Sequence, residues 1–284
     1  MAASTETTFR EVDRGGLRLL LWTGSALAGR VVAAFSTRQG GVSQGPYATL
    51  NLSAGVGDDP AAVAENRARL LAALGVEKDT VFCARQVHGT AILPARAATA
   101  EPAGHTARGQ ILWRVGSGDG LWTDRPGQVL LTFHADCVPI YLVDVEAGVA
   151  VLVHAGWRGT LAGAATQGVK TAAQAGAQPD RLWAAIGPAI GPCCYEVDQP
   201  VLERVYQRFG AGASALLRPA REGRARLDLW EANRRLLVAA GVPPNRIALA
   251  GLCTHCRDDL FFSHRRSGGR PAGRMAAVLA LVDG

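Results

Sequence analysis

Two apolar runs separated by a short turn constrain the fold of this chain more than any other feature. Residues 138–145 read VPIYLVDV and residues 149–154 read VAVLVH, with a turn near 145–148. Short runs rich in β-branched and large apolar residues are typical of buried strands. Because the turn is so short, it joins antiparallel neighbours. The sequence therefore predicts a buried antiparallel hairpin.

Other elements are expected to surround this hairpin. Similar apolar runs predict strands at 31–36, 128–134, 181–186, 246–251 and 275–282. Caps and periodicity predict helices at 60–74, 160–175, 198–209 and 228–240. The Gly-, Ala- and Pro-containing stretch 94–120 has little periodicity and is expected to be a long loop. Interleaved helices and strands with hairpin connections favour mixed sheets with helices outside, an α/β (mixed α+β) class that is not Rossmann.

Composition excludes several classes of protein. The chain has 284 residues, of which 48% are hydrophobic and 19% charged, so it can bury a sizeable core. Residues 1–15 contain no signal-peptide core and are expected to form a disordered tail. No apolar run approaches the ~20 residues of a membrane span, so we expect a cytoplasmic protein without membrane contact. The net charge of +6 comes from scattered arginines, which argues against nucleic-acid binding.

Three residues near strand ends suggest a metal site. Cys137 begins the first strand of the hairpin and His154 ends the second, so the two should lie opposite each other within a residue or two. His88 ends the strand-like run Gln86-Val87-His88, which is followed by glycine. Two imidazoles and a thiolate with an open fourth position are typical of catalytic zinc. The alternative is that these are ordinary buried residues.

The remaining cysteines and histidines give weaker patterns. Without an export signal, the six cysteines suggest thiols or metal ligands and not disulfides. Cys253 and Cys256 form half of a zinc ribbon, but a second C-x-x-C is missing, and Cys193-Cys194 could complete it only through the fold. Buried structural thiols are the simpler interpretation. His134 is interpreted as incidental, as is His105.

Longer motifs resemble a known family. They are, in order, FSTRQGGVSQGPYATLNLSAGVGDDPAAVAENR (35–67), QVHG (86–89), ADCVPI (135–140), HAGWRGT (154–160), IGPAIGPCCYEV (186–197) and FFSHRRSGG…GR (261–274). The combination is similar to the YfiH-type laccase-domain family, also named polyphenol oxidase or purine nucleoside phosphorylase. The resemblance runs from about residue 30 to the C-terminus.

The resemblance implies a fold and an activity. The fold would be a single CNF/YfiH-like domain over residues 16–284, with stacked mixed β-sheets flanked by helices. His88, Cys137 and His154 would bind zinc. The activity would be phosphorolysis of adenosine, inosine and methylthioadenosine, with deamination of adenosine. Two departures from the family pattern, SGDGL at 117–121 and His134 before ADC, are not expected to touch a ligand.

Three mechanisms remain to be compared. Laccase chemistry needs a blue-copper site and a trinuclear cluster, but the chain has only six histidines, so copper is expected at most as an adventitious occupant. A cysteine hydrolase using Cys137 and His154, including one that edits peptidoglycan precursors, is the main rival. Zinc-dependent nucleoside chemistry is favoured, with purine nucleosides and phosphate as the partners and no obligate protein partner.

Substrate and phosphate would need polar side chains around the zinc. The expected residues are Arg38, Asn51, Arg67, Gln86, Asp136 and Arg158, with Arg265, Arg266 and Arg274 as second choices. Arginine is favoured because its planar fork binds phosphate or carboxylate with two hydrogen bonds.

Overall fold

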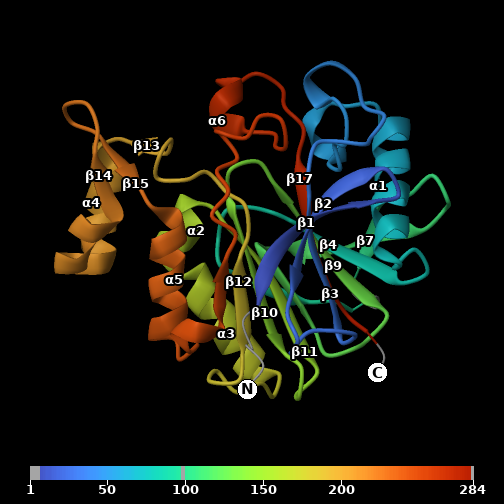
Figure 1. Cartoon of the computed structure of the whole chain (residues 1–284), viewed down its shortest axis with the longest axis horizontal. Helices are drawn as coiled ribbons and strands as arrows, with labels where there is room; N and C mark the ends of the chain where they lie inside the picture. The colour runs from blue at the N-terminus through green and yellow to red at the C-terminus, as the bar shows by residue number, and fades with distance from the viewer. Residues whose placement is uncertain (1–6, 97–99, 283–284) are drawn as a thin grey trace.

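The computed structural model describes residues 7–96 and 100–282, which form four layers (Figure 1). A helix covers one sheet, a second sheet packs behind the first, and further helices cover the outer face of the second. In the described residues, the first sheet has the order β1 (Thr8–Arg14), β2 (Leu17–Thr23), β3 (Val31–Ser36), β17 (Met275–Leu281), β9 (Gln128–His134), β4 (Thr80–Arg85), β7 (Ile111–Ser117) and β6 (Glu101–His105). The second has the order β16 (Ile247–Leu249), β12 (Trp183–Ile186), β10 (Val138–Asp144), β11 (Val149–Ala155), β8 (Gly120–Thr123) and β5 (Ile92–Pro94).

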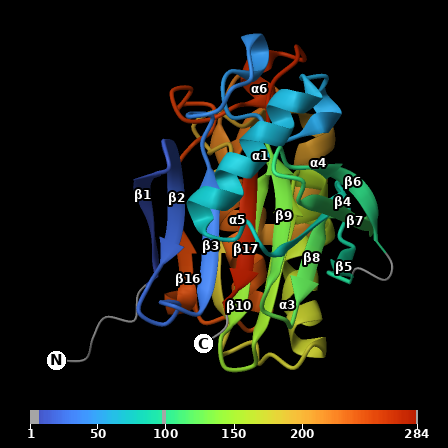
Figure 2. The ribbon, with the colours of Figure 1, turned by 90° about the vertical axis from the view of Figure 1, so that its right-hand side faces the viewer.

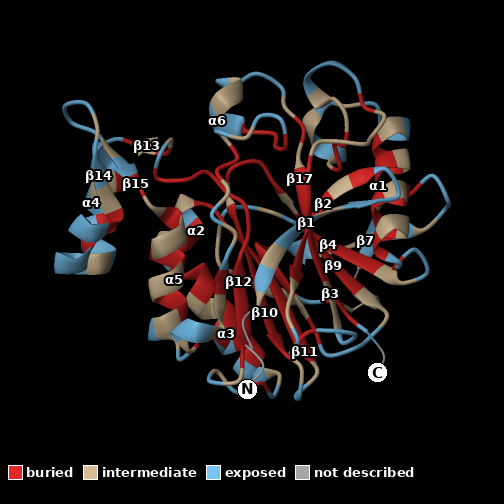
Figure 3. Ribbon diagram, viewed as in Figure 1, coloured by how far each residue is buried: buried red, intermediate tan, exposed pale blue. Residues whose placement is uncertain are grey.

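Strand alternation builds the core between and outside the sheets. On β17, Ala277 and Leu279 face the second sheet, whereas Val278 and Ala280 face the opposite side. On β10, Tyr141 packs between the sheets and Ile140 packs toward the outer helices. Strands that are buried on both faces consist of nearly continuous apolar residues, so these strands could be predicted from the sequence. The central strands are almost entirely buried (Figure 3).

The helices lie on the two outer faces of the sheets (Figure 2). α1 (Pro60–Leu74) covers the first sheet, and it begins after Asp59, whose side chain accepts from the backbone N–H of Ala61. α2 (Trp157–Ala162), α3 (Ala164–Gln174) and α5 (Leu229–Ala239) cover the second sheet. Short 3₁₀ helices are η1 (Gly45–Tyr47), η2 (Ala54–Val56), η4 (Gly210–Leu216) and η5 (Pro244–Arg246).

A smaller unit projects to the left of the sheets in Figure 1. It contains α4 (Gln199–Phe209) and a sheet of β13 (Glu196–Val197), β15 (Ala225–Leu227) and β14 (Leu217–Pro219). The last helix, α6 (His264–Ser267), lies above the sheets and leads back to β17. The whole unit is inserted between β12 and β16, which are parallel neighbours.

Most elements predicted from the sequence are confirmed. The hairpin pairs Asp144 with Val149 and Pro139 with His154, so Cys137 lies two positions beyond the residue opposite His154. The helix expected at 160–175 is divided into α2 and α3 at Gly163, whose φ of 93° ends a helix. In the described part of the chain, every helix is too short or too polar to cross a membrane.

Two predictions of local structure are wrong. The stretch 94–120 is not a loop, because β6 and β7 form the edge of the first sheet and β8 joins the second. These strands are partly exposed and contain glycine and proline, so they lack an apolar pattern. The expected disordered tail at 1–15 includes β1, which pairs with β2 along its whole length. Residues 1–6 lie outside the described part of the chain.

Candidate metal centre

His88, Cys137 and His154 converge on one point between the two sheets. Their ligand atoms all lie within 4.8 Å of one another, and the two imidazole rings are 5.1 Å apart. His88 follows β4 of the first sheet, and His154 lies on β11 of the second. Cys137 stands in the turn that carries the chain from β9 in the first sheet to β10 in the second. The three-residue group predicted from the sequence is therefore assembled by the stacking of the sheets.

The backbone around this group is shaped for close approach. His88 has a φ of 61°, a left-handed conformation that is uncommon outside glycine, and the glycine after it leaves room for the turn. Gly156 lies directly against the group, and a Cβ atom there would stand 3.0 Å from Cys137 Sγ and 3.0 Å from His88 Cδ2. Any side chain at position 156 would therefore crowd these two residues.

Asp119 orients two of the three residues, and the sequence analysis missed it. It is 1% exposed, and it accepts a hydrogen bond from His154 Nδ1 over 3.0 Å. It also accepts from the backbone N–H groups of His88 (2.8 Å) and Gly89 (2.6 Å). A protonated Nδ1 leaves Nε2 of His154 free to bind a metal. The expectation that the SGDGL segment lies away from the ligands is therefore wrong.

His134 also supports the group and is not incidental. It is buried, its Nδ1 lies 3.1 Å from the carbonyl oxygen of Cys137, and its ring is 5.2 Å from that of His154. Burial, followed by the charge of His154, lowers the pKa of His134 well below its ordinary value. A neutral His134 donates Nδ1–H to Cys137 and accepts from the Thr132 hydroxyl at Nε2.

Without a metal ion, the ionisation of Cys137 and that of His154 depend on each other. Burial acts to raise the pKa of the Cys137 thiol, but the charge of His154 and hydrogen bonds from His154 and His88 lower it to about 6. Burial acts to lower the pKa of His154, but the Cys137 charge and the Asp119 hydrogen bond raise it to about 9. Without a metal, the pair therefore exists as a thiolate and an imidazolium near neutral pH.

This coupling predicts how Cys137 reacts in metal-free protein. The lowered pKa means that the nucleophilic thiolate persists down to about pH 6 and is lost only below it. Alkylation by iodoacetamide, measured by peptide mass spectrometry, should therefore reach half its maximal rate near pH 6. Cys83 is the control, because burial raises its pKa to about 11 and it should stay unmodified at pH 7. A half-point for Cys137 near pH 9 would contradict this coupling.

The group opens into a cavity of about 580 Å³ with basic walls. The arginines and the further histidine that line it beside the group are Arg67, Arg85, Arg114, Arg274 and His264. Arg67 is 6% exposed and comes from α1, with Nε donating to the carbonyl of Leu52 over 3.0 Å. Gly104 makes room for it, because a Cβ there would stand 2.9 Å from Nη1. No other hydrogen bond of the Arg67 guanidinium to the described residues is seen.

The other expected site residues lie in different places. Gln86 lines the cavity, but its amide group pairs with the backbone of Phe133 at both atoms. Asn51 is buried and joins Ser53, Asp58 and the backbone N–H of Arg274. Asp136 is buried and accepts from Thr254 Oγ1 and from the backbone N–H of Arg265. Of these three residues, Gln86 lines the cavity, and Asn51 and Asp136 do not.

Arg38 and Arg158 do not line this cavity. Arg38 donates to the carbonyl of Ala48 and stacks 4.7 Å from the ring of Phe262. Arg158 stacks 4.4 Å from the ring of Trp157 and lines a separate cavity of about 850 Å³ with Arg265. Arg266 donates to the backbone of Thr254 and His255. Of the arginines expected from the sequence, Arg67 and Arg274 lie beside the metal-type group.

The donor set fits a zinc ion. Two imidazoles and one thiolate are borderline-soft ligands, and three protein ligands leave one position for a substrate. The buried carboxylate of Asp119 behind His154 is the partner that metal-bound histidines usually have. The structure thus contains a histidine and cysteine group that can hold a metal ion, facing a basic cavity.

Comparison with known proteins places the chain in a family. Residues 32–282 match the family model described as multi-copper polyphenol oxidoreductase laccase. The chain is 41% identical over 272 residues to the purine nucleoside phosphorylase YlmD of Geobacillus stearothermophilus, covering 95% of this chain and 96% of that protein. The crystal structure of YlmD from this species has a TM-score of 0.87 with this chain, at 39% identity, covering 97% of this chain and 99% of that one.

Two further relatives agree with this placement. The chain is 38% identical over 240 residues to the adenosine deaminase RL5 of an unknown prokaryotic organism, covering 84% of this chain and 89% of that protein. It is 35% identical to the crystal structure of the hypothetical protein YfiH of Bacillus licheniformis, with a TM-score of 0.86, covering 96% of this chain and 98% of that one. The chain therefore belongs to the multi-copper polyphenol oxidoreductase laccase family, the YfiH-type family that its motifs resemble.

Proposed function

We propose that this protein is a zinc-dependent purine nucleoside phosphorylase. Its substrates would be adenosine, inosine and methylthioadenosine, which it would convert with phosphate to the free base and (methylthio)ribose 1-phosphate. Deamination of adenosine would be a side activity. The observation that carries the proposal is the opening of the His88–Cys137–His154 group into a cavity lined by arginines. The names of YlmD and RL5 support this class of chemistry.

Phosphorolysis makes two demands that this cavity can meet. A phosphate oxygen forms a bond to C1′ of the sugar while the bond from C1′ to the purine breaks, and the purine takes the electron pair. The phosphate needs fixed positive charge, which Arg67 offers from a buried position. The departing purine needs its developing negative charge stabilised. When bound to His88, Cys137 and His154, zinc would supply a Lewis acid at this point.

Arg274 and His264 would complete the substrate site. Arg274 lines the cavity with its guanidinium held by the carbonyls of Ala272 and Gly273. Burial lowers the pKa of Arg274, whereas the negative charges of Cys137 and Asp136 act to raise it, so the guanidinium charge is felt at the metal-type group.

Substrates of this kind are small metabolites, and we propose that the protein acts on them in the cytoplasm.

Phosphate dependence tests this proposal. Zinc-loaded protein should release adenine from adenosine together with ribose 1-phosphate, and omission of phosphate should reduce adenine release to the hydrolytic background. Arg67→Gln should raise the KM for phosphate by about ten- to hundredfold, since hydrogen bonds to charged groups contribute ~1.5–3 kcal/mol. Arg158→Gln is the matched control and should keep the wild-type KM. Adenine release that is indifferent to phosphate would refute the phosphorylase.

A cysteine hydrolase is the second candidate, and one observation favours it. Asp119, His154 and Cys137 form a chain in which a buried carboxylate orients an imidazole beside a thiol with a lowered pKa. This arrangement suits a nucleophile, a base and an orienting group. In such a mechanism His88 would only help to lower the pKa of the Cys137 thiol. Its ligand atom nevertheless lies within 4.8 Å of those of Cys137 and His154, as a shared metal ion requires.

Copper oxidase chemistry, which the family description names, is not proposed. Among the described residues, His88, Cys137 and His154 are the group that combines histidine with cysteine at ligand distance. Reduction of O₂ to water needs a trinuclear histidine cluster in addition to a blue-copper site. Copper could still occupy the three ligands adventitiously, because it binds such sites more tightly than zinc.

A further inference from the structure

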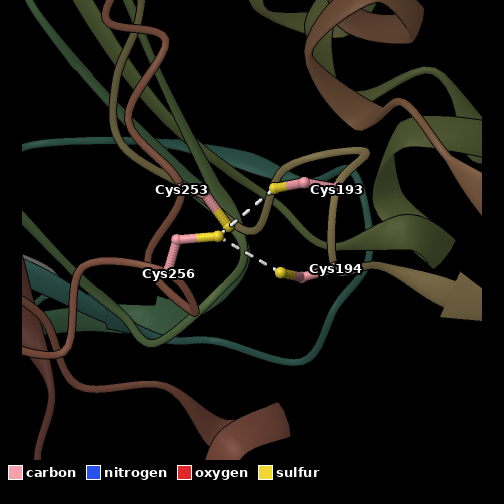
Figure 4. A group of neighbouring side chains, drawn as sticks. All are labelled: Cys193, Cys194, Cys253 and Cys256. Carbon is pink, nitrogen blue, oxygen red and sulfur yellow. Dashed lines mark hydrogen bonds between the residues drawn. The ribbon is translucent and has the colours of Figure 1, made fainter.

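Four cysteines that the proposed reaction does not use come together in the loops that follow β12 and β16. Their sulfur atoms all lie within 4.8 Å of one another (Figure 4). Cys256 Sγ is 3.5 Å from Cys193 Sγ and 3.3 Å from Cys194 Sγ. Cys253 is buried, whereas Cys193 and Cys256 are exposed. The interpretation of these residues as buried structural thiols is therefore wrong for the exposed pair.

The topology of the second sheet explains why these cysteines meet. β12 and β16 are parallel neighbours, so the loops that follow them leave the same edge of the sheet. Pairing continues beyond the strands, with a parallel bridge between Ala189 and Cys253. A tight turn then closes the first loop, because the backbone N–H groups of Cys194 and Tyr195 both donate to the carbonyl of Gly191. The fold thus brings Cys193-Cys194 beside Cys253 and Cys256, although the sequence has no second C-x-x-C.

The sulfur spacing suits a tetrahedral metal site and not a disulfide. Four thiolates at ~2.3 Å from a zinc ion lie about 3.8 Å apart, close to the spacings of the cluster. A disulfide requires ~2.05 Å between its sulfur atoms. The backbone N–H of Gly191 also donates to Cys253 Sγ over 3.2 Å, as expected for a sulfur that carries negative charge. Nearby, the Arg266 guanidinium donates to the carbonyls of Thr254 and His255 and so places positive charge beside the loop.

We propose that Cys193, Cys194, Cys253 and Cys256 bind a structural zinc ion, separate from the zinc of the proposed active site. A closed four-thiolate site has no open position for a substrate, so its role is to hold the fold together. It would clamp the loop that leads from β12 into the insertion with α4 and β13 to β15 to the loop that follows β16. Asp136 links this clamp to the cavity, because Ile190 donates to its backbone oxygen and Thr254 to its carboxylate.

Counting metal per chain tests this proposal. Protein expressed with ample zinc and analysed by native mass spectrometry and elemental analysis should contain two zinc ions per chain. Cys256→Ser and Cys193→Ser, which change exposed residues with little cost to packing, should each contain one. His88→Ala should also contain one, and the Cys256→Ser/His88→Ala double variant should contain none. Cys83→Ala, which removes a thiol outside both groups, should keep two.

Cobalt substitution gives an independent readout of the ligands. The sulfur-to-cobalt charge-transfer absorption should be dominated by four thiolates in wild-type and His88→Ala protein, and it should collapse in Cys256→Ser. The proposal would be overturned if the wild-type protein contained one zinc ion per chain and Cys256→Ser contained the same amount. Iron in the cluster would also overturn it. So would a disulfide, seen as a mass 2 Da lower with two cysteines alkylated only after reduction. These outcomes leave the phosphate test of the proposed function unaffected.

Discussion

Replacing any one of the three ligands, in His88→Ala, Cys137→Ser or His154→Ala, is expected to remove the active-site zinc and nucleoside turnover together. Because the three residues share one ion, the loss of one ligand weakens the hold of the other two. The fall in kcat/KM should exceed the ten- to hundredfold that loss of an outer partner typically costs. Zinc content and phosphorolysis measured on the same preparations check this. His105→Ala changes an exposed histidine away from the group and should behave as wild type.

The same variants separate the zinc enzyme from the cysteine hydrolase. A thiolate and imidazole pair needs no third ligand, so in a hydrolase His88→Ala would retain most of the activity while Cys137→Ser would be inactive. In the zinc enzyme all three variants should be equally impaired. Alkylation adds a second criterion, because bound zinc should shield Cys137 and a chelator should expose it. Active protein with a freely alkylated Cys137 would end the zinc mechanism.

Asp119→Asn should have the second-largest effect, although Asp119 is not one of the three residues of the metal-type group. The carboxylate accepts from His154 Nδ1 and from three consecutive backbone N–H groups, Val87 to Gly89. An amide has one oxygen to accept with, so several of these donors lose their partner in a buried place. Zinc affinity should fall by ten- to hundredfold, and kcat/KM should fall with it.

A matched control isolates this effect. Asp124→Asn makes the same chemical change at a more exposed position just beyond β8, and it should keep wild-type zinc affinity. Zinc affinity is measured by competition with a chromogenic chelator, and circular dichroism verifies the fold. If Asp119→Asn bound zinc as tightly as the wild-type protein, the orientation of the ligands would not depend on the Asp119 carboxylate, and Asp119 would have no positioning role.

The elements predicted well are those whose local sequence contains the whole reason for their structure. α1 has its cap, its proline and its terminal glycine within one stretch, and its observed bounds equal the predicted 60–74. β10 and β11 are buried on both faces, so they are almost continuously apolar, with Asp144 and His154 as exceptions near their ends. β1 and β6 fail this condition, because they are sheet edges whose side chains are mostly exposed. Their strand structure depends on a partner strand and not on their own composition.

The residues of the site likewise fall into those that the local sequence could predict and those that depend on distant pairing. Cys137 and His154 could be paired from the sequence because a short turn fixes their register. Asp119 reaches His154 only because β8 pairs with β11, and no local pattern predicts that pairing. Arg274 and Arg67 meet in the cavity from opposite ends of the chain. The four-cysteine cluster likewise depends on the parallel pairing of β12 with β16.

The metal-type group lies at the interface between the two sheets, and this position has a thermodynamic consequence. His88 belongs to the first sheet and His154 to the second, so an ion that binds both favours the one relative position in which the sheets stack correctly. By linkage, any substitution that shifts the sheets must weaken metal binding. Substitution of Tyr141 is one such change, because its hydroxyl on β10 donates a hydrogen bond to the carbonyl of Ala34 on β3 and so joins the two sheets. Packing between the sheets would thus contribute to metal affinity as well as to stability, even at residues far from the three ligands.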